Sequence, residues 1–169
     1  MTGMEVRLAT EADVDEIGRV HAVSRNAAYA GLVPAAALAR VTPQSQSQAW
    51  RERLAEAPEP FAVHVVVVDG TVQGVAMGSA DGPTAALDVL HVLPALHGSG
   101  AGRLLHDAVV RDFARWGCST AELWVLEGNE RAQAFYRRNG WAHDGGRDVH
   151  PVGGTDVPIL RYRRPVATP

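Results

Sequence analysis

The chain has 169 residues, a formal net charge of −3 at pH 7 and a hydrophobic fraction of 46%. This length suits one domain with a sizeable core and is too short for two domains of ordinary size. The small negative charge argues against nucleic acid or an anionic membrane as a partner. All sixteen basic residues are arginine, which we interpret as the codon bias of a GC-rich, bacterial genome.

Apolar runs in the chain are too short to cross a membrane. The longest run, from Val63 to Val68, is interrupted by His64 and falls far below the ~20 residues that a span requires. The amino terminus lacks the basic and apolar regions of a signal peptide. Cys118 is the only cysteine, which excludes an internal disulfide, and we assign it to buried packing. We therefore expect a soluble, cytoplasmic protein.

The first half of the chain predicts a strand, several helices and a hairpin. Thr10 is predicted to cap the first helix, and His21 on that helix is interpreted as a hydrogen-bonded structural histidine. Asp69-Gly70 between two apolar runs is a strong hairpin signal. The predicted elements are a strand at 6–8, helices at 14–24, 35–40 and 43–56, a break in the first helix at 26–34, and strands at 61–68 and 71–80.

The second half of the chain predicts alternating strands and helices around a glycine-rich loop. Residues 147–155, which include Pro151 and two glycines, predict a loop. The predicted elements are strands at 87–94, 120–126 and 158–163, a strand starting at Trp141, a helix from the glycine-rich loop to Gly117, and a helix at 131–138. We expect one domain over residues 1–164 and a disordered tail over 165–169.

The junction at residues 97–103, between a strand and a helix, is predicted to bind a phosphate or a diphosphate. The first N–H groups of a helix have no intrahelical acceptor, and glycines allow the main chain to approach a ligand closely. The P-loop pattern requires a lysine after its last glycine, and the chain has no lysine. The dinucleotide pattern G-x-G-x-x-G places Arg103 where the third glycine belongs. Both of these phosphate loops are therefore excluded.

Two motifs resemble those of the GNAT superfamily of N-acetyltransferases. His97-Gly98-Ser99-Gly100-Ala101-Gly102 is similar to the acetyl-CoA loop [QR]-x-x-G-x-[GA]. His97 stands where Gln or Arg is usual. It can still donate a hydrogen bond, but it lacks the permanent positive charge of an arginine. The stretch from Asn129 to Trp141 resembles N-x-x-A-x-x-x-Y-x-x-x-G-[FW] at every defining position. Two motifs in this order are hard to obtain by chance.

The resemblance implies a mixed α/β fold in which helices flank a largely antiparallel central sheet. The sheet splays between its fourth and fifth strands, and acetyl-CoA lies in the opening as co-substrate, with no metal. The implied cofactor contacts are the main chain of Leu90, His91 and Val92 along the pantetheine arm, His97, Gly98, Ser99, Gly100, Ala101, Gly102 and Arg103 at the diphosphate, Asn129 at the arm, and Tyr136 near the sulfur.

The activity implied by the resemblance is an acetyl-CoA-dependent N-acetyltransferase. It transfers an acetyl group by direct attack to a primary amine of a small molecule or an amino-acid-like acceptor, with Tyr136 as general acid. A protein or peptide N-acetyltransferase and a non-catalytic acyl-CoA-binding module remain as alternatives. Many relatives are dimers, so a homodimer is also left open.

The general base and the acceptor pocket are less well defined by sequence. Ribosomal-protein N-terminal acetyltransferases of the superfamily carry a glutamate five residues before the asparagine, where this chain has Trp124. This argues against that subfamily and predicts Trp124 as a wall of the acceptor site. Asp88 is the first candidate base, ahead of His91, with water and Glu127 as further candidates. Tyr29, in a stretch that looks like the amino-terminal region of bacterial members, is a candidate pocket residue.

Overall fold

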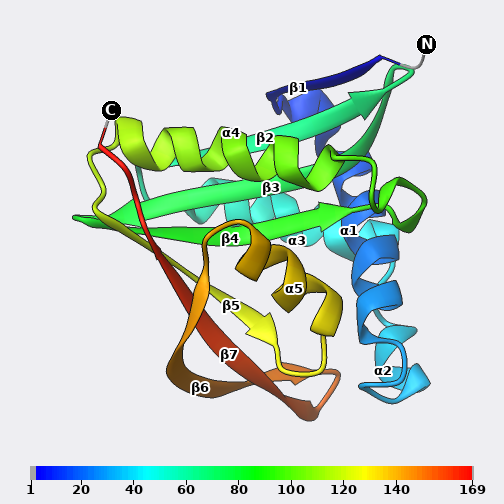
Figure 1. The fold of residues 1–169 in the computed structure, drawn as a ribbon. Helices are drawn as coiled ribbons and strands as arrows, with labels where there is room; N and C mark the ends of the chain where they lie inside the picture. The colour runs from blue at the N-terminus through cyan, green and yellow to red at the C-terminus, as the bar shows by residue number, and fades with distance from the viewer. Residues whose placement is uncertain (1–2, 169) are drawn as a thin grey trace.

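A computed structural model describes residues 3–168, so Pro169 of the expected tail lies outside the described residues. Seven strands form one mixed sheet in the order β1-β2-β3-β4-β5-β7-β6 (Figure 1). The strands are β1 Met4–Leu8, β2 Phe61–Val68, β3 Thr71–Asp81, β4 Thr84–Val92, β5 Thr120–Leu126, β6 Ala142–Val152 and β7 Thr155–Pro165. The α-helices are α1 Val14–Tyr29, α2 Ala35–Leu38, α3 Pro43–Glu56, α4 Ala101–Arg115 and α5 Glu130–Arg138, with 3-10 turns at Glu11–Asp13 and Pro94–Leu96.

Helix α4 packs against one face of the sheet, and its apolar residues recur every four positions. Leu105, Val109 and Phe113 are at most 1% exposed and belong to one core cluster. Gly78 on β3 allows this close packing, because a Cβ there would lie 2.6 Å from Val109 Cγ1. The packing fixes the axis of α4, so that its amino terminus lies beside the far end of β4 (Figure 1).

The two leucines at the start of α4 provide a matched test of this packing. Leu105 is fully buried, whereas the neighbouring Leu104 is 45% exposed. We expect Leu105→Ala to lower the free energy of unfolding by about 2–5 kcal/mol, because it leaves a cavity in the core. Leu104→Ala should change it by no more than about 0.5 kcal/mol. Urea denaturation of both variants checks the difference, and equal losses would contradict the packing of α4.

Helices α1 and α3 cover the opposite face and form a second core cluster with β2 and β3. Ile17, Val20 and Trp50 are at most 1% exposed there. The predicted end of the first helix before residue 26 is wrong, since α1 continues to Tyr29. The alanines after Asn26 are good helix formers, and the Asn26 side chain donates a hydrogen bond to the Val41 carbonyl (3.0 Å) rather than competing with the helix.

Strands β4 and β5 separate after a short parallel contact. They pair only at 84–86 with 120–122, although β4 continues to Val92. Beyond this point β4 pairs with β3 alone, so main-chain groups on its other edge are free of strand partners among the described residues. Asp88 has no opposite residue in the β3–β4 register, because Met77 pairs with Val89 and Gly78 pairs with Leu87. The expected mixed, splayed α/β sheet is therefore confirmed.

The loop predicted at 147–155 is wrong, because β6 extends through most of it to Val152. Its residues pair with β7, and the hairpin turns at Gly153 and Gly154, which have φ of +56° and +86°. Pro151 is tolerated because β6 is an edge strand, where a missing N–H costs no ladder bond.

The last strand also continues beyond the predicted position 163. β7 ends at Pro165, and the next residue, Val166, is 6% exposed and donates its amide to the Ser119 carbonyl (2.9 Å). Within residues 3–168, no helix combines the length and apolar character needed to cross a membrane.

Candidate active site

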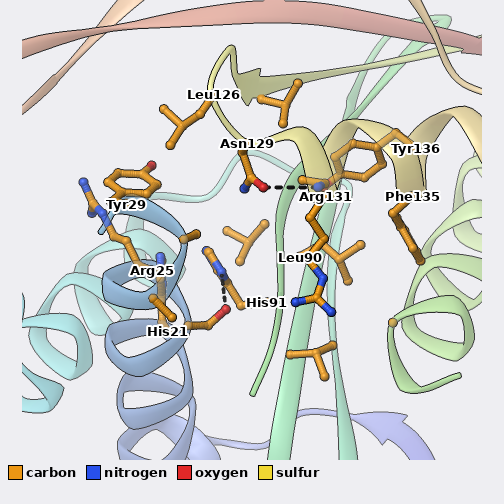
Figure 2. Close-up of a pocket in the computed structure, with 18 of the residues that line it drawn as sticks. His21, Arg25, Tyr29, Leu90, His91, Leu126, Asn129, Arg131, Phe135 and Tyr136 are labelled. Atoms are coloured by element: carbon orange, nitrogen blue, oxygen red, sulfur yellow. Dashed lines mark hydrogen bonds between the residues drawn. The ribbon is translucent and has the colours of Figure 1, made fainter. Parts of the chain in front are cut away.

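A cleft of about 1440 Å³ opens where β4 and β5 separate. Figure 2 shows Tyr29, Arg25 and His21 of α1 on one side of it, and Phe135 and Tyr136 of α5 on the other. The strand β4 runs between these two walls. The cleft therefore joins residues from helices that lie on opposite faces of the sheet.

One end of the cleft is the glycine-rich loop before α4. Gly98 and Gly100 have φ of +81° and +92°, a conformation that favours glycine. The amides of Gly98, Gly100, Gly102 and Arg103 make no hydrogen bond to a main-chain carbonyl of the described residues. Four unpaired N–H groups at a helix amino terminus form a site for an anion such as a diphosphate.

Arg131 of α5 adds a permanent positive charge beside this loop. It lines the same cleft as His97 and Gly98. Partial desolvation, and then the charge of Arg131, lower the pKa of His97, so the imidazole is neutral at neutral pH. Relative to an arginine at this position, neutral His97 lacks a positive charge, and Arg131 supplies one beside the same loop. The sequence analysis missed Arg131.

Asn129 stands at the start of α5 and has a structural function there. Its Oδ1 accepts a hydrogen bond from the Ala132 amide (3.1 Å), as an N-cap (Figure 2). Its Nδ2 makes no hydrogen bond with another described residue and remains available as a donor in the cleft. The predicted contact of Asn129 with the cofactor arm is compatible with this arrangement.

Tyr136 lies further along α5 and is 9% exposed. Its ring packs between Phe135, Trp141 and Tyr162. Its hydroxyl makes no hydrogen bond to any described residue, and the side chain lines the cleft. Burial raises the pKa of Tyr136 well above its ordinary value, so the phenol stays protonated and can only donate its proton near neutral pH.

Comparison of the sequence with known protein families gives an independent result. Residues 32–141, more than half of the chain, match the family model of the acetyltransferase (GNAT) family. The chain belongs to the GNAT acetyltransferase family. The family resemblance drawn from the two motifs is thereby confirmed.

Relatives of this GNAT chain include N-acetyltransferases of Mycobacterium bovis and Mycobacterium tuberculosis, both described as uncharacterized. They are 38% identical to it over 80 residues, which cover 47% of this chain and 51% of theirs. The chain thus spans about half the length of the curated relatives it matches.

Solved structures share the GNAT fold at low sequence identity. The PaiA N-acetyltransferase from Thermoplasma acidophilum, in complex with coenzyme A, is 17% identical, with a TM-score of 0.76 over 96% of this chain and 99% of that one. The ribosomal-protein-S18-alanine N-acetyltransferase from Escherichia coli is 17% identical, with a TM-score of 0.72 over 99% of this chain and 96% of that one. These likenesses establish the fold.

Among the candidate bases of this GNAT chain, Asp88 lies on β4 within the cleft. Its Oδ2 accepts a hydrogen bond from the Ser79 hydroxyl (2.7 Å). Desolvation raises the pKa of Asp88, while Ser79 and the charge of Arg53 oppose the shift. Glu127 is not among the residues lining the cleft, and its carboxylate pairs with Arg147 (2.7 Å).

His91, the second candidate base, lies on β4 and joins a polar network with residues of α1. Its Nδ1 is 3.0 Å from Ser24 Oγ, and its ring centroid is 4.4 Å from that of His21 (Figure 2). Trp50 Nε1 donates to His21 Nδ1 (2.9 Å), which leaves the His21 proton on Nε2. Burial lowers the pKa of His21 to about 2 and that of His91 to about 4. Both rings are neutral, and His91 is a weakened base.

The predicted acceptor residues Tyr29 and Trp124 both line the cleft. Trp124 is 42% exposed, and the guanidinium carbon of Arg161 lies 5.7 Å from its ring centroid. The guanidinium group of Arg161 therefore already makes a cation–π contact with the Trp124 ring. Tyr29 is contacted in the same way by Arg25, at 5.1 Å.

The residues lining the cleft that sequence reasoning missed include Arg25, Arg53 and His150. A signal for Arg25 was present, because His21, Arg25 and Tyr29 follow an i, i+4, i+8 spacing along one face of α1. No comparable signal marks His150, which lies on the strand that was predicted to be a loop.

Proposed function

We propose that this GNAT chain is an acetyl-CoA-dependent N-acetyltransferase that acetylates a primary amine of a small, amino-acid-like acceptor by direct attack. The observation that supports it best is one continuous cleft, lined by the four unpaired amides of the glycine-rich loop, the protonated phenol of Tyr136 and the carboxylate of Asp88. Acetyl-CoA fits this donor set, because its diphosphate matches the amides and its pantetheine arm matches the free edge of β4.

In the proposed reaction the amine nitrogen forms a bond to the thioester carbonyl carbon, the C–S bond breaks, and the products are an amide and CoA thiol. Asp88 takes the proton that the nitrogen loses, directly or through water. Tyr136 donates a hydrogen bond or a proton to the departing sulfur. A tyrosine pKa above ~10 exceeds the ~8.5 of a thiol, so full proton transfer is uphill and hydrogen bonding carries much of the effect.

The decisive test is consumption of acetyl-CoA, followed as release of free thiol, across amino acids, polyamines, aminoglycosides and short peptides. We expect turnover with at least one small amine and a stoichiometric acetylated product by mass spectrometry. Tight CoA binding without transfer to any amine would contradict an enzyme and favour an acyl-CoA-binding module. Transfer confined to peptides would identify a peptide N-acetyltransferase instead.

Binding of the diphosphate by main-chain amides can be tested at Gly100. Gly100→Ala introduces a Cβ at φ of +92°, so the loop must shift and its amides lose alignment. Loss of one charged hydrogen bond costs about 1.5–3 kcal/mol, and we therefore expect the Kd for CoA to rise by about 10-fold or more. Isothermal titration calorimetry with CoA measures this.

Gly117 supplies the matched control for backbone strain. It lies just beyond the other end of α4, with φ of +75° and open space where an added Cβ would lie, and it does not line the cleft. Gly117→Ala should cost a similar ~1–2 kcal/mol of stability and leave the Kd for CoA unchanged. If both variants weaken CoA binding equally, the effect comes from general strain, and the amide site is contradicted.

A further inference from the structure

We propose that the acceptor carries a carboxylate or a similar anionic group, and that Arg25 of α1 and Arg53 of α3 bind it on the wall of the cleft opposite α5. This inference rests on the proposed function, because it specifies the class of amine that receives the acetyl group. It assigns the two arginines as determinants of acceptor specificity.

Arg25 is held in place against an aromatic ring. Its guanidinium carbon lies 5.1 Å from the ring centroid of Tyr29, and the side chain lines the cleft (Figure 2). Its Nε is buried and has no hydrogen-bond partner among the described residues. No described carboxylate lies within ion-pair distance of it. A buried charged donor without an acceptor is unusual, and a bound anion would supply the acceptor.

Arg53 also lies against an aromatic ring, although it is more exposed than Arg25. Its guanidinium carbon lies 4.9 Å from the ring centroid of Trp50, which is fully buried and hydrogen-bonded to His21. Within residues 3–168, Arg53 forms neither an ion pair nor a hydrogen bond. Arg51, two residues earlier on α3, instead pairs with Asp15 (2.8 Å).

The charges on this wall do not balance. Arg25 and Arg53 contribute two positive charges, and Asp88 on β4 is the acidic group whose charge acts on Arg53. The neighbouring rings of His21 and His91 are neutral and add no charge. An anionic group placed between the two guanidinium groups removes the excess, and planar forks of N–H donors suit a carboxylate.

The same arrangement orients the reacting nitrogen. A zwitterionic acceptor bound through its anion at Arg25 and Arg53 can turn its ammonium toward Asp88, which carries the opposite charge and is the proposed base. A peptide amino terminus has no carboxylate beside its amine unless its first side chain is acidic. The wall therefore favours a free amino acid or a similar small acid over most peptides.

Matched acceptor pairs test the inference directly. We would measure kcat/KM for glycine, alanine and methionine and for their amides, with the wild type and with Arg25→Met, Arg53→Met and Arg51→Met. We expect the wild type to prefer each acid by about 10-fold or more, since a charged hydrogen bond is lost in the amide. The preference should vanish in Arg25→Met and Arg53→Met through a higher KM for the acid, and persist in Arg51→Met. Arg25→Lys should retain part of it.

Equal or better turnover of the amides by the wild type would overturn the inference while leaving the proposed function intact. If no amine is acetylated, the proposed function fails, and binding then decides the inference. Calorimetry with N-acetylmethionine and N-acetylmethioninamide in the presence of CoA should show tighter binding of the acid, lost in Arg53→Met and kept in Arg51→Met. Equal binding of the two products would overturn it. Circular dichroism confirms that each variant is folded.

Discussion

Replacing Tyr136 by phenylalanine is expected to lower kcat by about 10²-fold, with little change in the KM for acetyl-CoA. The magnitude follows from typical contributions of a positioned proton donor. The hydroxyl makes no hydrogen bond with the described residues, so removing it should leave the packing of the ring against Trp141 and Tyr162 unchanged. Burial raises the pKa of Tyr136, so its protonation should add no limb to the pH profile below pH ~10. Steady-state kinetics at saturating acetyl-CoA provides the measurement.

Tyr162 is the matched control for Tyr136, because it is also a buried tyrosine but has a structural hydroxyl. Its hydroxyl donates to Gln133 Oε1 (2.9 Å) and accepts from Arg137 Nη1 (3.1 Å), and it does not line the cleft. Tyr162→Phe should lower the free energy of unfolding by about 1–3 kcal/mol, because it leaves Gln133 without its partner, and retain kcat. Tyr136→Phe should do the reverse. Unchanged kcat in Tyr136→Phe would remove the phenol from the mechanism.

Asp88→Asn is expected to lower kcat at neutral pH by about 10²-fold and to remove the acidic limb of its pH profile. Asp88 accepts a proton only as a carboxylate, so activity is present above its pKa and is lost as the pH falls through it. Desolvation raises the pKa of Asp88, which places the limb above pH ~3.9. The amide is nearly isosteric and can still accept the hydrogen bond from Ser79. The profile of kcat at saturating acceptor measures the limb.

Two further variants separate Asp88 from its competitor. Ser79→Ala removes a hydrogen bond that favours the charged form of Asp88, so the acidic limb should move to higher pH while kcat at the plateau is kept. His91→Gln should leave the position of the limb unchanged, because Asp88 and not His91 takes the proton in the proposed reaction. The pKa of His91 is lowered, and its Nδ1 lies 3.0 Å from Ser24 Oγ. A limb that survives Asp88→Asn and disappears in His91→Gln would assign the base to His91.

The parts of the fold that follow from short-range rules were predictable. The glycine-rich loop, the helix start capped by Thr10 and the Asp69-Gly70 hairpin each depend on residues close in sequence. The errors arose where a distant partner overrides local preference. Residues 147–152 contain Pro151 and few apolar side chains, yet the antiparallel ladder with β7 keeps them extended.

The sequence by itself determined the family and the position of the glycine-rich loop and Tyr136. Each motif is a contiguous stretch, so its residues are placed relative to the start of a single helix. Only the tertiary structure decided which side chains lie across the cleft from these two motifs. Arg25 and Arg53 belong to helices packed on the other face of the sheet, and they reach the cleft because β4 and β5 separate after Ala86. The two arginines share one cleft with the glycine-rich loop and Tyr136 because segments far apart in the chain are in contact, and no local pattern encodes such contacts.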